Sequence, residues 1–176
     1  QLLTAGTRYK ATIALEELMD VEDELEVFEF NFAIIKRTFN VSIKQFETTD
    51  ETDFSSQNLV GSLHFSAPVD SSAVKEILNA TQDGEELNIK LVKESNFKYA
   101  FTVKNIQRKS EQSDLVLKWD GEAIGVNKKS SKKIVIPTAD EFVVMDVEVK
   151  HAPTQYVIVH FSDPLDTDQF LEGLIY

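Results

Sequence analysis

Cysteine is absent from this chain of 176 residues. That absence excludes disulfide bonds, thiolate nucleophiles and zinc sites built on cysteine. Glycine is scarce as well, with 6 residues, and the sequence has none of the glycine-rich loops that cradle phosphate groups, so it implies no nucleotide or other cofactor. No run of about 18 apolar residues occurs, so we expect no transmembrane segment.

Positive charge is also in short supply. Lysine and arginine number 18 against 30 aspartates and glutamates, which gives a formal net charge of −12. Nucleic-acid binding requires a basic surface that displaces counterions from phosphates, so this composition argues against a nucleic-acid partner. The first ten residues are neither a signal peptide nor a natural start, and we therefore expect a piece of a longer protein.

What the chain does have is alternation of apolar and polar residues with a period of two, which is typical of strands with one buried face. The alternating segments are residues 28–34, 39–43, 59–65, 87–91, 97–103, 115–119 and 134–136. We therefore predict a mainly β protein.

Two segments break this pattern and favour short helices. In the first, residues 70–84, Asp70 is a candidate N-cap and Gly84 follows the expected end. The second follows Asp166, which would be its N-cap, and covers residues 167–175. We expect about two turns in the first of these helices.

One octet occurs twice, as HFSAPVDS at 64–71 and HFSDPLDT at 160–167. Each copy is interpreted as a strand end, a proline that leaves the sheet, and an aspartate that caps a helix. The structural residues assigned on this basis are Phe65, Pro68 and Asp70 in the first copy and Phe161, Pro164 and Asp166 in the second. We expect truncation of Phe65 or Phe161 to alanine to cost about 3–5 kcal/mol.

Further landmarks recur in the same order. FNVSIKQF at 39–46 precedes the first octet as FVVMDVEV at 142–149 precedes the second, and YAFTVKNI at 99–106 is similar to YKATIALEEL at 9–18. Recurrence in a fixed order indicates tandem modules. We predict Ig-like β-sandwich modules divided as 1–37, a trailing half; 38–140, a complete module; and 141–176, a leading half.

Half a sandwich exposes an apolar face and unpaired strand edges. The two terminal halves are complementary in kind, so we expect them to complete a sandwich, either within one chain or in a domain-swapped homodimer. The alternative is that the two octets mark diverged sheet edges within a single fold.

Asp120-Gly121 lies between two apolar segments, and this dipeptide is favoured in two-residue hairpin turns. We predict such a turn there, with Trp119 as a core residue beneath it. An exposed Trp119 could instead contact a sugar ring.

No catalytic or metal site emerges from the sequence. The histidines are scattered and no Gly-x-Ser-x-Gly segment occurs, so we assign no catalytic residue. Acidic clusters at 50–53 and 163–168 could hold calcium, but they lack the aspartate-rich calcium loop and favour capping and solubility. Lysines 128, 129, 132 and 133 either blunt a hairpin edge or dock an acidic partner.

The segments 115–137 and 142–175 resemble the N-terminal region of bacterial alpha-2-macroglobulin-like proteins. FSDPLDTDQFLEGLI at 161–175 is the most specific part of the similarity, and LTAGTRYKATI at 3–13 is similar to the late strand of the same modules. The resemblance implies a large protein of macroglobulin-type domains, extracytoplasmic, in the periplasm or anchored to the outer membrane as a lipoprotein.

Members of that family inhibit proteases by enclosing them in a cage after a bait segment is cut, and some use a cysteine thioester. The resemblance therefore implies a non-catalytic scaffold whose partners are neighbouring macroglobulin-type domains and, through the parent protein, proteases. Two alternatives stay open: an Ig-like adhesin or glycan-binding module, and an accessory domain of a hydrolase.

Overall fold

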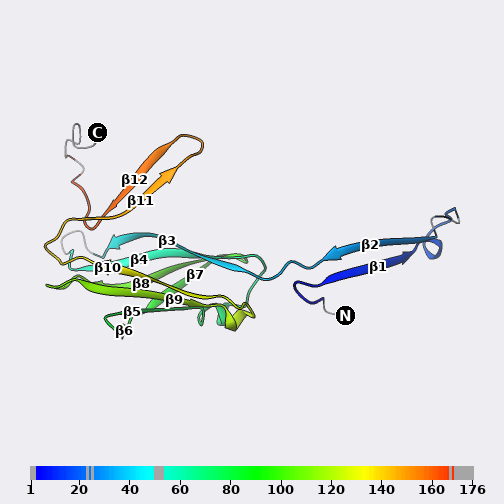
Figure 1. Cartoon of the computed structure of the whole chain (residues 1–176), viewed down its shortest axis with the longest axis horizontal. Helices are drawn as coiled ribbons and strands as arrows, with labels where there is room; N and C mark the ends of the chain where they lie inside the picture. The colour runs from blue at the N-terminus through cyan, green and yellow to red at the C-terminus, as the bar shows by residue number, and fades with distance from the viewer. Residues whose placement is uncertain (1–2, 23, 25, 50–53, 167, 169–176) are drawn as a thin grey trace.

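The computed structural model describes residues 3–22, 24, 26–49, 54–166 and 168. Antiparallel sheets make up most of it, and the helical elements are single short turns. A central sandwich carries one hairpin at each end (Figure 1). The predicted mainly β architecture is therefore confirmed.

The central sandwich consists of two four-stranded sheets. The first has the order β3-β4-β8-β7, with bounds Phe39–Thr48, Ser56–Phe65, Lys98–Gln107 and Ile89–Ser95. The second has the order β10-β9-β5-β6, with bounds Lys129–Ile136, Ser113–Asp120, Leu78–Gln82 and Glu85–Glu86. All of these pairings are antiparallel, and both sheets contribute side chains to one core.

That core belongs entirely to the central part of the chain. Among the described residues, every buried hydrophobic side chain lies between Phe39 and Ile136. Strand alternation places these residues inward, as in β9, where Leu115 and Leu117 are fully buried and their neighbours are not. Residues 38–140, predicted as the complete module, thus contain a whole hydrophobic core.

The N-terminal hairpin has two unlike faces. It comprises β1 (Arg8–Ala14), a 3₁₀ turn η1 (Leu15–Glu17) and β2 (Val27–Ala33). Because paired residues share a face, one side is apolar and aromatic and contains Tyr9, Ala11, Ile13, Phe28, Phe30 and Phe32. The other side is polar and is crossed by the Lys10–Glu29 ion pair at 2.7 Å.

The C-terminal hairpin is also two-faced. It comprises β11 (Val144–Lys150) and β12 (Tyr156–Phe161). Its apolar side pairs Val147 with Val159 and Val149 with Val157, and three of these valines are more than half exposed. Asp146, Glu148 and His160 alternate with these valines along the strands and therefore lie on the other side.

These two hairpins lie at opposite ends of the molecule (Figure 1). Each forms a separate two-stranded sheet. The expectation that the terminal halves pair within one chain is therefore not what the structure shows, and exchange between chains stays a prediction.

The helix predicted within residues 70–84 is shorter than expected, and a strand follows it. Asp70 does cap a helix, α1, but α1 covers only Ser71–Val74, and β5 begins at Leu78. In β5 the buried residues alternate, and pairing with β9 outweighs the local helical pattern. The chain then turns at Asp83 and Gly84, whose φ values are 51° and 90°, in the two-residue hairpin that joins β5 to β6.

The two-residue hairpin predicted at Asp120-Gly121 is wrong. Asp120 pairs with Lys129, so residues 121–128 form a longer connection that contains the 3₁₀ turn η3 (Glu122–Ile124). Gly121 has a φ of −85°, which other residues can also adopt. Glycine is needed there because a side chain would clash with neighbouring atoms. A Cβ atom there would lie 2.7 Å from Phe39 Cε1 and 2.6 Å from the Val126 carbonyl oxygen.

The landmark similarity between 9–18 and 99–106 also needs correction. Residues 99–106 belong to β8, a central strand between β4 and β7, whereas β1 pairs with β2 alone. A strand, a 3₁₀ turn and an antiparallel strand follow one another in both β1-η1-β2 and β9-η3-β10. The N-terminal hairpin therefore corresponds to β9-β10. The second predicted helix, at 167–175, lies outside the described residues except for Asp168.

Candidate functional site

The serine of each octet makes the same backbone contacts. Ser66 Oγ accepts a hydrogen bond from the Thr38 amide at 2.9 Å, and the Ser66 amide donates to the Thr38 carbonyl at 3.0 Å. In the second octet Ser162 Oγ accepts from the Val143 amide at 3.0 Å, and the Ser162 amide donates to the Val143 carbonyl at 2.9 Å. The two octets thus hold equivalent positions. In each, the serine after the second strand of a hairpin is hydrogen-bonded to the residue that precedes the first strand.

Sequence reasoning missed these serines although both octets contain them. It singled out Phe65 and Phe161, which stack on Phe39 and Phe142 with ring centroids 6.2 and 5.1 Å apart. Phe65 is buried, whereas Phe161 is only half-buried and its partner Phe142 is exposed. Phe161 is therefore a residue of an uncovered hairpin, not of a closed core.

Replacing Ser162 with alanine is expected to raise the exchange rate of the partly buried Val143 amide by about tenfold or more, because this amide then loses its acceptor. Ser162 is 2% exposed, and Ser131, which is exposed on β10, provides the matched control. NMR-detected hydrogen exchange measures both variants. Unchanged protection of Val143 in Ser162→Ala would show that this contact does not hold the strand.

The remaining predicted residues of the two octets, two prolines and two aspartates, are exposed. Pro68 and Pro164 are exposed where the chain leaves each hairpin. Asp70 accepts hydrogen bonds from the Ser72 hydroxyl and amide, and these bonds hold the pKa of that carboxyl below its usual range. Asp166 accepts from the Asp168 amide at 2.9 Å, as an N-cap does.

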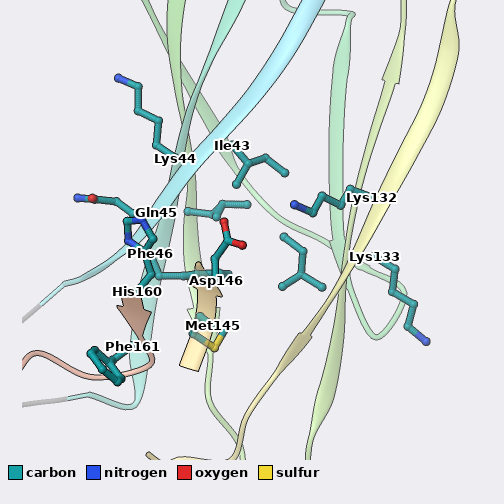
Figure 2. A pocket seen from close by; sticks show the side chains of 12 residues that line it. Ile43, Lys44, Gln45, Phe46, Lys132, Lys133, Met145, Asp146, His160 and Phe161 are labelled. Atoms are coloured by element: carbon teal, nitrogen blue, oxygen red, sulfur yellow. The ribbon is translucent and has the colours of Figure 1, made fainter. Parts of the chain in front are cut away.

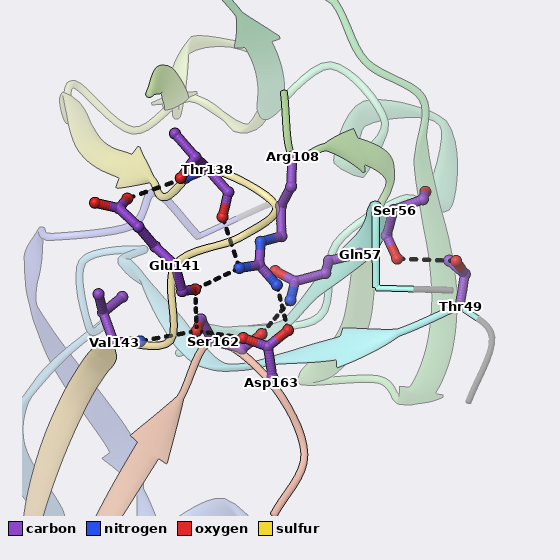
Figure 3. A network of polar contacts seen from close by, with 9 residues as sticks. All are labelled: Thr49, Ser56, Gln57, Arg108, Thr138, Glu141, Val143, Ser162 and Asp163. Carbon is purple, nitrogen blue, oxygen red and sulfur yellow. Dashed lines mark hydrogen bonds and ion pairs between the residues drawn. The ribbon is translucent and has the colours of Figure 1, made fainter. Parts of the chain in front are cut away.

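A buried polar network joins the second octet to the sandwich (Figure 3). Arg108, which follows β8, is fully buried, and its Nη1 forms an ion pair with Asp163. Its Nη2 donates to the carbonyl oxygens of Thr138 and Glu141 at 2.7 and 2.6 Å. Beside it, the Gln57 side chain donates to the Ser162 carbonyl oxygen. We call this network the Arg108 clamp.

The clamp orients the chain more than it adds net stability. Desolvation of a buried ion pair offsets much of its attraction, but leaving one partner alone costs several kcal/mol. The planar guanidinium presents donors in a fixed fork, so its acceptors must lie in fixed directions. Arg108 is one of three arginines in the chain. Its role could not be predicted from a local sequence pattern, because its partner Asp163 lies 55 positions away.

Beyond the clamp, a groove of about 420 Å³ separates the C-terminal hairpin from the sandwich. Its walls are β3 and β10 on the sandwich and Met145, Asp146 and His160 on the hairpin (Figure 2). His160 Nε2 lies 3.5 Å from Glu148 Oε1 on the neighbouring strand of the same hairpin. The described hydrogen bond and ion pair that reach from Ser162 and Asp163 to the sandwich belong to the clamp.

Two of the four lysines in the predicted basic loop, Lys129 and Lys133, are paired with carboxylates of neighbouring residues. Lys128 Nζ donates to the Phe39 carbonyl at 2.8 Å, and Lys129 contacts Asp120 and Glu122, both at 2.7 Å. These carboxylates raise the pKa of Lys129, and Lys129 lowers that of Asp120. Lys133 pairs with Asp114 at 2.7 Å. This arrangement fits a protected strand edge.

Within the described part of the chain, histidine and acidic side chains form no cluster that could hold a metal ion. Asp163, from the acidic group at 163–168, contacts Arg108, while residues 50–53 lie outside the described ranges. None of the helices in the described ranges is long and apolar enough to cross a membrane. Comparisons with protein-family models, curated proteins and solved structures found no match.

Proposed function

We propose that this chain is a non-catalytic scaffold segment of a bacterial alpha-2-macroglobulin-like protease inhibitor. The observation that carries the proposal is the doubled octet, which makes the same serine contacts at the ends of two hairpins. Such repetition is what a row of macroglobulin-type modules requires. The resemblance of residues 142–175 to that family supplies the function.

The terminal hairpins support a longer array. Each turns an apolar face outward, and an isolated two-stranded hairpin is marginally stable in water. In the parent protein, neighbouring macroglobulin-type strands would cover these faces. In the isolated chain the same faces would pair between copies, as a swapped homodimer.

In this proposal the segment spaces and orients domains of an extracytoplasmic cage, in the periplasm or on the outer membrane. Its partners are the adjoining modules, and proteases meet the parent protein as a whole. The core of residues 39–136 supplies a rigid unit, and the Arg108 clamp fixes the angle to the next one.

A trapping assay tests this function on the longer polypeptide that contains the segment. A protease enclosed in a cage is expected to keep cleaving a small peptide substrate while losing activity on a large protein substrate. Equal inhibition of both substrates, or inhibition of neither, would contradict the proposal. The 176-residue chain alone serves as the control and should inhibit neither.

Glycan binding is a second candidate, favoured by the position of Trp119. This side chain is half-buried and lines a groove of about 420 Å³ with the polar residues Asn79, Lys118 and Ser130. Aromatic faces beside polar groups suit sugar rings. Glycan-array binding lost in Asn79→Ala, which leaves the core intact, would support this function over the scaffold.

A further inference from the structure

The two octets differ where they meet the rest of the chain. Their fourth residue is Ala67 in the first copy and Asp163 in the second, while the His-Phe-Ser before it is identical. Because Ser66 and Ser162 make the same contacts, the fourth residue occupies an equivalent place in both. We call the connection at residues 34–38 the first joint and the connection at residues 137–143 the second joint. At the fourth octet position Ala67 has no side-chain acceptor, whereas Asp163 has a carboxylate.

At the second joint, Asp163 contacts Arg108 at the end of the sandwich that we call its base, where Gln57 also lies. Arg108 is held there by its own amide, which donates to the Ser55 carbonyl at 2.8 Å, and its side chain is fully buried. The carboxylate of Asp163 is 18% exposed and also accepts from Ser162 Oγ at 2.7 Å. Both ends of the ion pair are thus fixed before they meet.

The guanidinium also fixes the connecting segment. Nη2 donates to Thr138 and Glu141, so the chain between β10 and β11 is bound on the same side as the octet. These bonds are polar contacts between the sandwich and the base of the hairpin, and a groove lies beyond them. Without Asp163, the arginine would keep a buried charge with no counter-ion.

The first joint has no such contact. Among the described residues, no hydrogen bond or ion pair joins the N-terminal hairpin, residues 3–34, to the sandwich strands. Ser66 contacts only the connecting residues Lys36 and Thr38, and Arg37 donates to the Ile124 carbonyl at 3.1 Å. Ala67 offers no acceptor, and the hairpin extends away from the sandwich (Figure 1).

We propose that the base of the sandwich, formed by Arg108 and Gln57, is a docking surface for the following module and selects an octet with aspartate at its fourth position. Aspartate locks the joint, whereas alanine leaves it free to bend. The chain accordingly has a rigid joint at 137–143 and a hinge at Ile35, which is exposed and lies between the N-terminal hairpin and the bound residues 36–38. This inference does not depend on what the parent protein inhibits or binds.

Spin labels on the full chain test the proposal, and the lack of native cysteine makes the labelling specific. Cysteines replace Lys90 on the sandwich and Gln155 on the C-terminal hairpin, or Lys90 and Asn31 on the N-terminal hairpin, all of which are exposed. Double electron–electron resonance should give a narrow distance distribution for the first pair and a broad one for the second. Equal widths in the unaltered chain would overturn the proposal.

Asp163→Ala is expected to broaden the first distribution to the width of the second. Arg108→Met combined with Asp163→Ala removes the buried unpaired charge, so this pair should restore the melting temperature while the distribution stays broad. A narrow distribution in that double variant would overturn the proposal. Lys109→Met, which removes an exposed ion pair with Asp83, is the matched control and should leave the distribution narrow.

Discussion

Truncating Phe65 to alanine is expected to lower the free energy of unfolding by about 3–5 kcal/mol, the range for a buried aromatic side chain. Phe65 is 5% exposed and closes one end of the core. Its ring stacks on Phe39 and meets Tyr99 edge-on, with centroids 6.0 Å apart and planes at 89°. Truncation would leave a cavity in the core shared by the two sheets, and the surrounding side chains could fill it only partly.

Phe161→Ala is the matched comparison, because the residue occupies the equivalent octet position. It should cost clearly less than Phe65→Ala, since Phe161 is half-buried and stacks on an exposed ring. Urea denaturation followed by the fluorescence of Trp119 measures both variants. Equal losses would show that the C-terminal hairpin belongs to the same closed core.

Replacing Gly61 with alanine is expected to cost about 3 kcal/mol, the upper end for overpacking a core. Gly61 lies in the middle of β4, and a Cβ atom there would be 2.3 Å from Phe101 Cζ and 2.5 Å from the Ser42 carbonyl oxygen. Phe101 is 1% exposed, so its ring has little room to move. The ring covers a glycine in the sheet, and the two residues depend on each other.

Thermal and urea denaturation of Gly61→Ala, Phe101→Leu and the double variant form a mutant cycle for this contact. We expect the double variant to be more stable than the sum of the single effects predicts, because the smaller side chain vacates space for the new methyl group. Strict additivity would show that the clash is with the Ser42 backbone alone.

The strands could be predicted from the sequence because alternation is a local signal. Leu115 and Leu117, or Leu59 and Leu63, face the core as their period of two requires. The segment after Asp70 could not be assigned in the same way. Its Val74 and Ile77 suit a helix, and only pairing of Leu78–Gln82 with β9, which lies far along the chain, makes a strand there.

Turn types and the contacts between the hairpin and the sandwich could not be predicted from the sequence. Both Asp83-Gly84 and Asp120-Gly121 carry the same dipeptide, but only the first is a two-residue hairpin. The second fails because η3 packs Ile124 into the core and needs a longer connection. The Arg108 clamp unites residues 57, 108, 138, 141 and 163, and no periodic pattern connects positions so far apart.

Hydrogen exchange of the whole chain at low concentration tests most directly whether one complete module stands between two hairpins of neighbouring modules. We expect the amides of β4, β8 and β9 to exchange only through global unfolding, and those of β1, β2, β11 and β12 to exchange far faster, since the apolar faces of these hairpins lack a covering sheet. Uniformly high protection from β1 to β12 in a monomer would contradict it.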